Sequence, residues 1–172
     1  MATATPTGAP LLGTPQAQAR TRMIQTQITD RLATLLATCK GAGYPSLVGT
    51  TVLVGQVKGA EQQAPAIFVI PETVNVAAKY GNDIITRGYR LAAFAKLSDH
   101  PTYSEHGLID QIIRDVRSVM ETRDAVASIG LIALGATVQF QNAAPGYHED
   151  GGQLVGAALQ YQIVFTQAAP PA

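Results

Sequence analysis

The chain has 172 residues, of which 14% are charged, and its 12 basic and 12 acidic side chains leave a formal net charge of zero. This balance excludes bulk electrostatic attraction to nucleic acid or to an anionic membrane as the main source of binding. The charged fraction is well below the ~25% that is usual for soluble domains, so we expect partners to cover part of the surface.

The length suits one domain with a substantial hydrophobic core. We expect a single domain over 15–167, a disordered tail over 1–14, which is rich in Ala, Thr, Pro and Gly, and a flexible tail over 168–172. The N-terminus lacks the basic and apolar regions of a signal peptide, and no apolar run approaches the ~20 residues that span a bilayer. We therefore expect a protein without a membrane partner that is assembled in a cytoplasm.

An amphipathic helix is predicted over 15–39, because Thr14-Pro15 is typical of a helix start and Lys40-Gly41 of a helix end. Its apolar residues recur at helical spacing: Met23, Ile24, Ile28, Leu32, Leu35, Leu36 and Cys39. Cys39 is the single cysteine, so an intrachain disulfide is excluded, and its place on the apolar side predicts a buried structural thiol.

Three strands are predicted next, over 50–57, 66–70 and 83–97. Pro71 makes the second an edge strand or a bent strand. The third alternates apolar and polar side chains over its whole length, which is typical of a half-buried strand. The segment between them, 72–83, contains Gly81-Asn82 and is predicted to be the tip of a long hairpin that stands clear of the core.

The second helix begins after Pro101, where Thr102 and Glu105 have the spacing of a capping box. One apolar stripe runs along it: Leu108, Ile109, Ile112, Ile113, Val116, Val119 and Met120. The opposite side is expected to be wet, and it carries Asp110, Arg114, Arg117 and Glu121.

Two last strands are predicted over 135–141 and 153–165. Odd-numbered residues of the last strand form an apolar face, and even-numbered ones form a face that is small and mostly uncharged. The element order α-β-β-β-α-β-β predicts an α+β fold with an antiparallel or mixed sheet of about five strands and two helices on one face. The other face then needs loops or another subunit to cover it.

His148, Glu149 and Asp150 have the side chains of a metal site, but only His148 and Asp150 can converge in an extended chain. Two ligands are too few, and neither His100 nor His106 stands at a metal-ligand spacing. Three interpretations stay open: a solvated polar turn before two glycines, an intersubunit contact of the acidic pair with basic residues, and a metal site.

Ser104, Glu105 and His106 have the letters of a hydrolase triad, but they lie in the first turn of a helix without a nucleophile elbow. No glycine-rich motif has a nucleotide-binding context. Arg87 and Arg90 are candidates for a positive contact with a polar partner, or else are solvated strand residues. No catalytic, cofactor-binding or metal residue is assigned, so we expect no enzyme and a function that depends on surfaces.

Five segments in this order resemble the tail terminator proteins of tailed bacteriophages over about 20–167. They are the N-terminal helix, "PAIFVIPE", "DIITRGYRLAAFA", "LIDQIIRDVRSVM" and "YHEDGGQLVGAALQYQIVF". The resemblance implies an α+β sandwich whose subunits form a hexameric ring in the virion. Such a ring caps the tail tube, ends its polymerisation and joins the tail to the neck below the head.

The partners implied by the resemblance are further copies of the chain, the tail tube protein, neck or head-connector proteins and a sheath protein. DNA would pass through the ring without specific binding. Interface candidates are Lys79, Tyr80, Arg87, Arg90, His148, Glu149, Asp150, Gln160 and Gln162. The alternatives are a head-completion or stopper protein of the neck and a small metal-dependent enzyme built on His148 and Asp150.

Overall fold

The computed structural model describes residues 27–121, 137–147 and 153–168. The two predicted tails and the start of the first helix lie outside these residues, apart from Ala168. A helix covers 27–36 and is followed, in chain order, by these elements: η1 (Ala37–Lys40), β1 (Thr51–Val54), α2 (Ala60–Gln63), β2 (Ala66–Lys79), β3 (Asn82–Lys96), η2 (Leu97–Asp99), α3 (Glu105–Met120), β4 (Thr137–Tyr147) and β5 (Leu154–Ala168).

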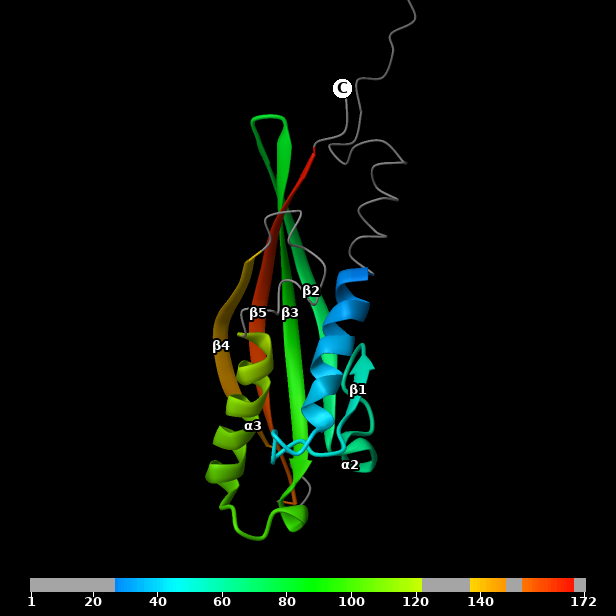
Figure 1. Ribbon diagram of the computed structural model, residues 1–172, viewed down its shortest axis with the longest axis vertical. Helices are drawn as coiled ribbons and strands as arrows, with labels where there is room; N and C mark the ends of the chain where they lie inside the picture. The colour runs from blue at the N-terminus through cyan, green and yellow to red at the C-terminus, as the bar shows by residue number, and fades with distance from the viewer. Residues whose placement is uncertain (1–26, 122–136, 148–152, 169–172) are drawn as a thin grey trace, which may run out of the picture.

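The strands form one mixed five-stranded sheet in the order β1-β2-β3-β5-β4. β1 is parallel to β2, and every other neighbouring pair is antiparallel. β3 and β5 pair over their full lengths, from Asn82 opposite Ala168 to Lys96 opposite Leu154. The helix over 27–36 and α3 both lie on one face of this sheet (Figure 1). The predicted α+β fold, with a mixed sheet and two helices on one face, is confirmed.

The main core lies between the two helices and the odd-numbered residues of β3 and β5. In β5 the whole predicted apolar face is buried, and it consists of Val155, Ala157, Leu159, Tyr161, Ile163 and Phe165. Ile28, Leu32 and Leu36 of the first helix and the predicted stripe of α3 pack on it, with Ile113 half-buried. The period of two in the strands and of 3.6 in the helices thus places apolar side chains in one shared layer.

The predicted capping box of α3 is wrong. Ser104, not Thr102, caps this helix, and its hydroxyl oxygen accepts a hydrogen bond from the Gly107 N–H at 3.1 Å. A serine immediately before the first helical residue can reach a free N–H of the first turn. Thr102 lies two residues too early, in the turn that follows η2.

The hairpin of β2 and β3 is longer than predicted, because β2 does not end at Ile70 but continues to Lys79. Its register shifts between Pro71 and Val74, so the expected bend at the proline is present as a bulge. The turn itself is Tyr80-Gly81, one residue before the predicted Gly81-Asn82. Both turn residues have positive φ, 49° and 78°, as a two-residue type I′ turn requires.

The last two strands also exceed their predicted bounds. β4 begins at Thr137 and continues to Tyr147, six residues beyond the predicted end, and β5 continues to Ala168. Asn142, Pro145 and Gly146 are weak strand formers, but here each lies opposite a residue of β5. Pairing with a long neighbour therefore overrides the local preference.

A small second cluster covers one end of the face opposite the helices. Phe68, Ala92 and Leu154 are buried there under the segment that contains Ala60 of α2. Phe68 and Phe94 contact each other edge to face, with ring centroids 6.0 Å apart. The segment that contains α2 therefore covers this end of the face. The sequence predicted that either loops or another subunit would cover the face opposite the helices, and at this end a loop does so.

Candidate interaction surfaces

The rest of the face opposite the helices is here called the open face. It carries small or uncharged polar side chains that lie opposite one another on β3, β5 and β4: Thr86, Gly88, Gln160, Gln162, Gln139 and Asn142. Gln160 and Gln162, both predicted interface residues, are half-buried. The Gln160 side-chain oxygen accepts a hydrogen bond from the Asn142 amide at 2.8 Å. These side chains are uncharged, and most of them are polar.

Arg87 and Arg90 do not lie together, although the sequence suggested both as positive contacts. A separation of three in a strand puts them on opposite faces. Arg90 is exposed at the margin of the open face, opposite Gln160, and its Nε lies 3.5 Å from Oε1 of Glu72. Arg87 is half-buried on the helix side, 5.5 Å from the centroid of the Tyr89 ring. Only Arg90 is therefore available to a partner at the open face.

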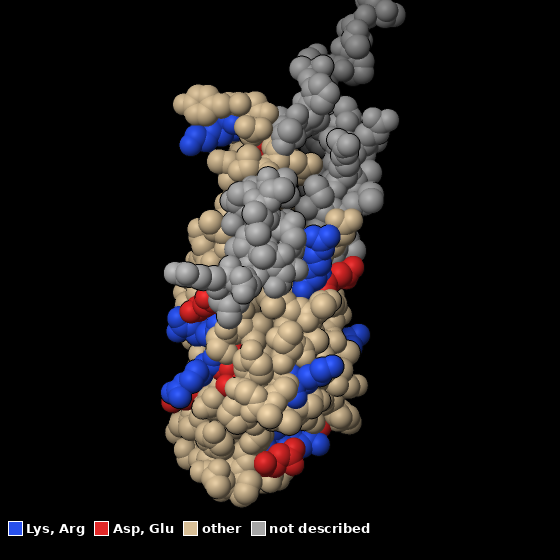
Figure 2. Space-filling model, in the orientation of Figure 1, with Lys and Arg blue, Asp and Glu red and all other residues tan. Residues whose placement is uncertain are grey.

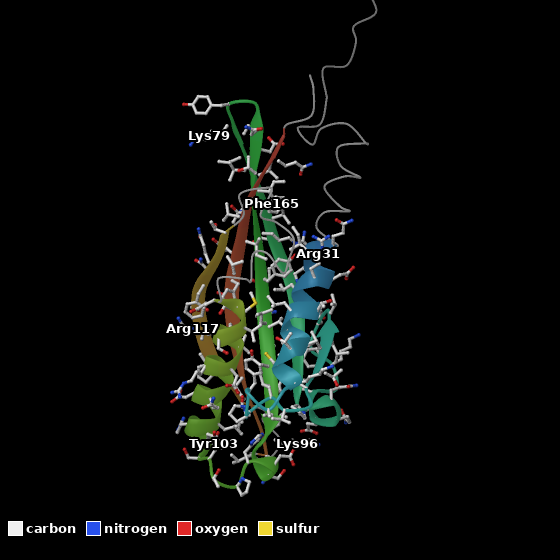
Figure 3. All side chains as sticks on the ribbon, viewed as in Figure 1. Arg31, Lys79, Lys96, Tyr103, Arg117 and Phe165 are labelled. Atoms are coloured by element: carbon white, nitrogen blue, oxygen red, sulfur yellow. The ribbon has the colours of Figure 1, made fainter. Side chains whose placement is uncertain are left out.

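The distal hairpin, residues 72–82, extends beyond both helices, and all of its residues are exposed (Figures 1 and 3). Tyr80 at the tip is 92% exposed, and the Lys79 ammonium lies 6.0 Å from the centroid of its ring. A tyrosine with positive φ is uncommon, and tyrosine is enriched among the residues that contribute most to binding at protein interfaces. The predicted pair Lys79 and Tyr80 is thus brought to one projecting point.

His148, Glu149 and Asp150 lie outside the described residues, so the three interpretations of this turn stay predictions. Within the described ranges, the carboxylates, histidines and cysteine do not form a group of three that could hold a metal ion. Ser104, the first letter of the apparent triad, already serves as the cap of α3.

Cys39 is fully buried, as predicted. Burial and, to a smaller extent, the charge of the nearby Asp115 carboxylate together raise the pKa of its thiol from 9.0 to about 12. The thiol is therefore protonated at neutral pH and has neither the charge nor the access of a nucleophile.

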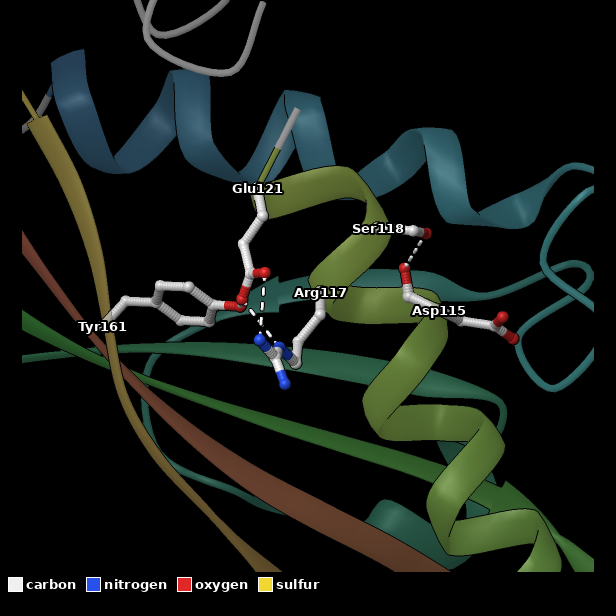
Figure 4. Close-up of polar contacts among 5 residues, drawn as sticks. All are labelled: Asp115, Arg117, Ser118, Glu121 and Tyr161. Atoms are coloured by element: carbon white, nitrogen blue, oxygen red, sulfur yellow. Dashed lines mark hydrogen bonds and ion pairs between the residues drawn. The ribbon is translucent and has the colours of Figure 1, made fainter. Parts of the chain in front are cut away.

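A shallow groove of about 420 Å³ on the outer side of α3 is lined by Asp110, Ile113, Arg114, Arg117, Ser118 and Glu121. Arg117 is engaged within the chain: its Nε donates to Oε1 of Glu121 at 2.7 Å, and its guanidinium lies 4.3 Å from the centroid of the Phe140 ring. The Tyr161 hydroxyl donates to the same carboxylate at 3.4 Å (Figure 4). These contacts attach the end of α3 to β4 and β5, so this cluster is structural.

The tyrosine of this cluster is buried, and burial raises the pKa of its phenol far above the ordinary value of 10.0, with the Glu121 carboxylate as a second cause. Tyr161 is therefore a neutral hydrogen-bond donor throughout the physiological range. It gives no indication of acid–base catalysis at this place.

Charged side chains are scattered over the helix side of the molecule in ones and twos, with broad uncharged areas between them (Figure 2). This distribution agrees with the low charged fraction of the chain and does not suggest a strongly basic or acidic partner. Among the described helices, none combines the length and the apolar character needed to cross a membrane.

No protein-family model matches the chain, and no curated protein matches it. Among solved structures, it is similar to a chain described as "Virion of native gene transfer agent (GTA) particle", with 12% sequence identity and a TM-score of 0.45. The match covers 84% of this chain and 98% of that chain. A likeness of this size leaves the role of the protein to be inferred from its own residues.

Sequence reasoning missed several residues of the open face, among them Gln139 and Asn142 on β4. Their signal was weak because Asn142 lies beyond the predicted end of the strand and because the bulge at Gln141 shifts the alternation. By contrast, the sequence alone indicates that Arg87 and Arg90 lie on opposite faces of the sheet, because one position is odd and the other even.

Proposed function

We propose that this protein is a structural component of a tailed-phage virion that acts as a tail terminator, forming a hexameric ring through surface contacts and not through catalysis. The observation that carries the proposal is a sheet with one face closed by two helices and the other face without a helix among the described residues and poor in charge. On the four long strands, the charged residues of that side are Lys79, Arg90, Lys96 and Glu72, which pairs with Arg90.

A monomer with few charges and an open sheet face leaves much uncharged surface in water, and a repeated contact between identical subunits removes part of it. In a closed ring each subunit makes two interfaces, one with each neighbour, so several interfaces of modest affinity combine into a stable assembly.

The distal hairpin is the proposed contact with the last ring of the tail tube, since it projects from the body and ends in Lys79 and Tyr80. The opposite end of the molecule would then face the neck or head-connector proteins. In this arrangement the ring ends tube growth by occupying the surface on which the next tube subunit would bind.

Two measurements test this proposal. Native mass spectrometry of the purified protein, alone and mixed with tail tubes, is expected to show a six-subunit species or its capture on tube ends. Electron micrographs of the mixture should show tubes capped at one end. A protein that stays monomeric in both samples and leaves tube length unchanged would contradict the proposal.

The tube contact has a matched pair of variants. Tyr80→Ala removes the exposed aromatic ring of the tip and is expected to weaken tube binding without loss of the ring. Val48→Ala removes a side chain that is 51% exposed elsewhere on the surface and should leave tube binding unchanged. Equal binding by the two variants would exclude the hairpin tip as the tube contact.

A further inference from the structure

Among the residues that the structure describes, the two outer edges of the sheet are both open over part of their length. β1 covers β2 only where Thr51–Val54 lie opposite Ala66–Val69. Among the described strands, the remainder of β2 has β3 as its only neighbour, and β4 has only β5. Within the described residues, each edge therefore presents backbone N–H and C=O groups without a strand partner, and these groups can pair with another strand.

Natural edge strands are usually protected by charged side chains, prolines or bulges. β4 has no charged residue over 137–147, and its bulge and Pro145 interrupt only the middle and the far end. In β2 the proline and the bulge lie before Val74, and the regular part beyond them carries Val74 and Val76, which are 36% and 58% exposed. We call 137–144 the β4 edge and 74–79 the distal β2 edge.

We propose that the β4 edge of one copy pairs with the distal β2 edge of the next copy, so that the sheet continues from subunit to subunit. This inference deepens the proposed ring and rests on it. The four long strands β2, β3, β5 and β4 alternate in direction. Rotation about an axis at an acute angle to the strands therefore brings β4 antiparallel to the next β2, and the alternation continues across the junction.

The heights of the two edges agree with the tilt that such closure needs. The heights of the two edges can be compared along β5. The distal β2 edge pairs with residues of β3 that lie opposite 163–168 of β5, whereas the β4 edge lies directly opposite 158–164 of β5. The centres differ by roughly four to five residues, or ~15 Å at ~3.3 Å per residue, across about 19 Å of sheet for four strands. Such an offset corresponds to a strand tilt of about 40°, within the range of closed barrels.

The direction of this offset also agrees with closure of the subunits into a ring. Seen from the helix side, β4 lies on the left and β2 on the right, with the distal β2 edge at the upper end (Figure 1). A neighbour on the right must therefore sit higher to bring its β4 beside the distal β2 edge. Right-handed coiling of the strands shifts neighbours in this sense when the helices are outside. The open face would then line the inside of the ring.

Disulfide trapping tests the junction. Gln139 and Ala77 are exposed on the side of the open face, since they lie opposite Gln162 and Ile84. Under mild oxidation, the double variant Gln139→Cys/Ala77→Cys is expected to form a ladder of covalent oligomers up to the full ring. A second double variant, Gln139→Cys/Asn75→Cys, tests a junction in which the register of β4 against β2 is shifted by two residues. The matched control, Gln139→Cys/Thr51→Cys, places the second cysteine on β1, outside the proposed junction, and should form no ladder.

The outcome separates this inference from the function on which it rests. A ring in native mass spectrometry without a ladder from either pair would overturn the strand junction and leave the proposed function standing. An absence of any oligomer would contradict both. Because Cys39 is buried, it is not expected to contribute to the ladder.

Charged substitutions at the same two positions test the strand junction independently. Gln139→Lys/Ala77→Lys places like charges on the two edges and should abolish the ring, while Gln139→Glu/Ala77→Lys should restore it. Both positions are exposed, so the urea midpoint of the subunit should stay close to that of the unmodified protein. Rings of equal abundance in the two variants would overturn the junction.

Discussion

Asp115 shows how one residue can connect distant parts of the chain. It lies on the buried side of α3 and is 4% exposed. One carboxylate oxygen accepts hydrogen bonds from the backbone N–H and the hydroxyl of Ser46, and the other accepts from the Gln111 side chain at 2.7 Å. The carboxylate thereby holds the loop between η1 and β1 against α3, and its buried oxygens are satisfied.

Asp115→Ala is expected to lower the free energy of unfolding by about 2–4 kcal/mol, because two buried donors of Ser46 would lose their acceptor. Asp110→Ala, on the exposed side of the same helix, is the control and should change stability by less than ~0.5 kcal/mol. Urea unfolding followed by circular dichroism measures both. Equal midpoints for the two variants would contradict the role of Asp115.

Cys39 gives a second prediction at the residue scale. Because burial raises the pKa of its thiol to about 12, iodoacetamide at pH 8 should label the unfolded protein and leave the folded protein unmodified. A raised folded pKa also means that stability is fully present below the unfolded value of 9.0 and is lost as pH rises toward 12. The urea midpoint should accordingly fall from pH 8 to pH 10. Rapid labelling of the folded protein would contradict this account.

At the scale of elements, the closest approach between strands is at Gly156 of β5. A Cβ at this position would lie 2.7 Å from the carbonyl oxygen of Ala93 and 2.6 Å from a ring carbon of Phe94. Backbone cannot yield as a flexible side chain can, so the glycine is required for β3 and β5 to pair beneath the aromatic cluster.

Gly156→Ala is therefore expected to destabilise the protein by about 1–3 kcal/mol through overpacking. Gly146 lies directly opposite on β4, and a Cβ there would meet no atom closer than 3.6 Å. Gly146→Ala is the matched control and should be tolerated. Thermal denaturation compares them, and a wild-type melting temperature for Gly156→Ala would show that the strands can separate locally.

At the scale of the whole molecule, the shortage of charge predicts how assembly responds to salt. The open face and both proposed edges bury few charged groups, so screening should hardly weaken the contacts between subunits. The ring is expected to persist from about 0.05 to 1 M NaCl in light scattering. Dissociation on raising the salt would instead indicate ion pairs, such as those suggested by the acidic turn at 148–150.

Much of the fold could be predicted from local patterns in the sequence. Apolar residues at a period of two or 3.6 located the long strands β3 and β5 and the helix α3, because each such pattern can bury only one face. The hairpin was visible in the same way, although its turn was one residue away from the prediction. Locating the candidate residues Lys79 and Tyr80 near its tip required nothing beyond the chain order.

Contacts between distant segments decided the remainder. The extension of β4 through Asn142 and Gly146 depends on β5, the place of Gly156 depends on Phe94, and the burial of Asp115 depends on Ser46. Sequence patterns report which face a residue occupies, whereas pairing partners, offsets and close approaches arise only when strands are laid side by side. For the same reason the two open edges, at different heights on opposite sides of the sheet, became visible only in the tertiary structure.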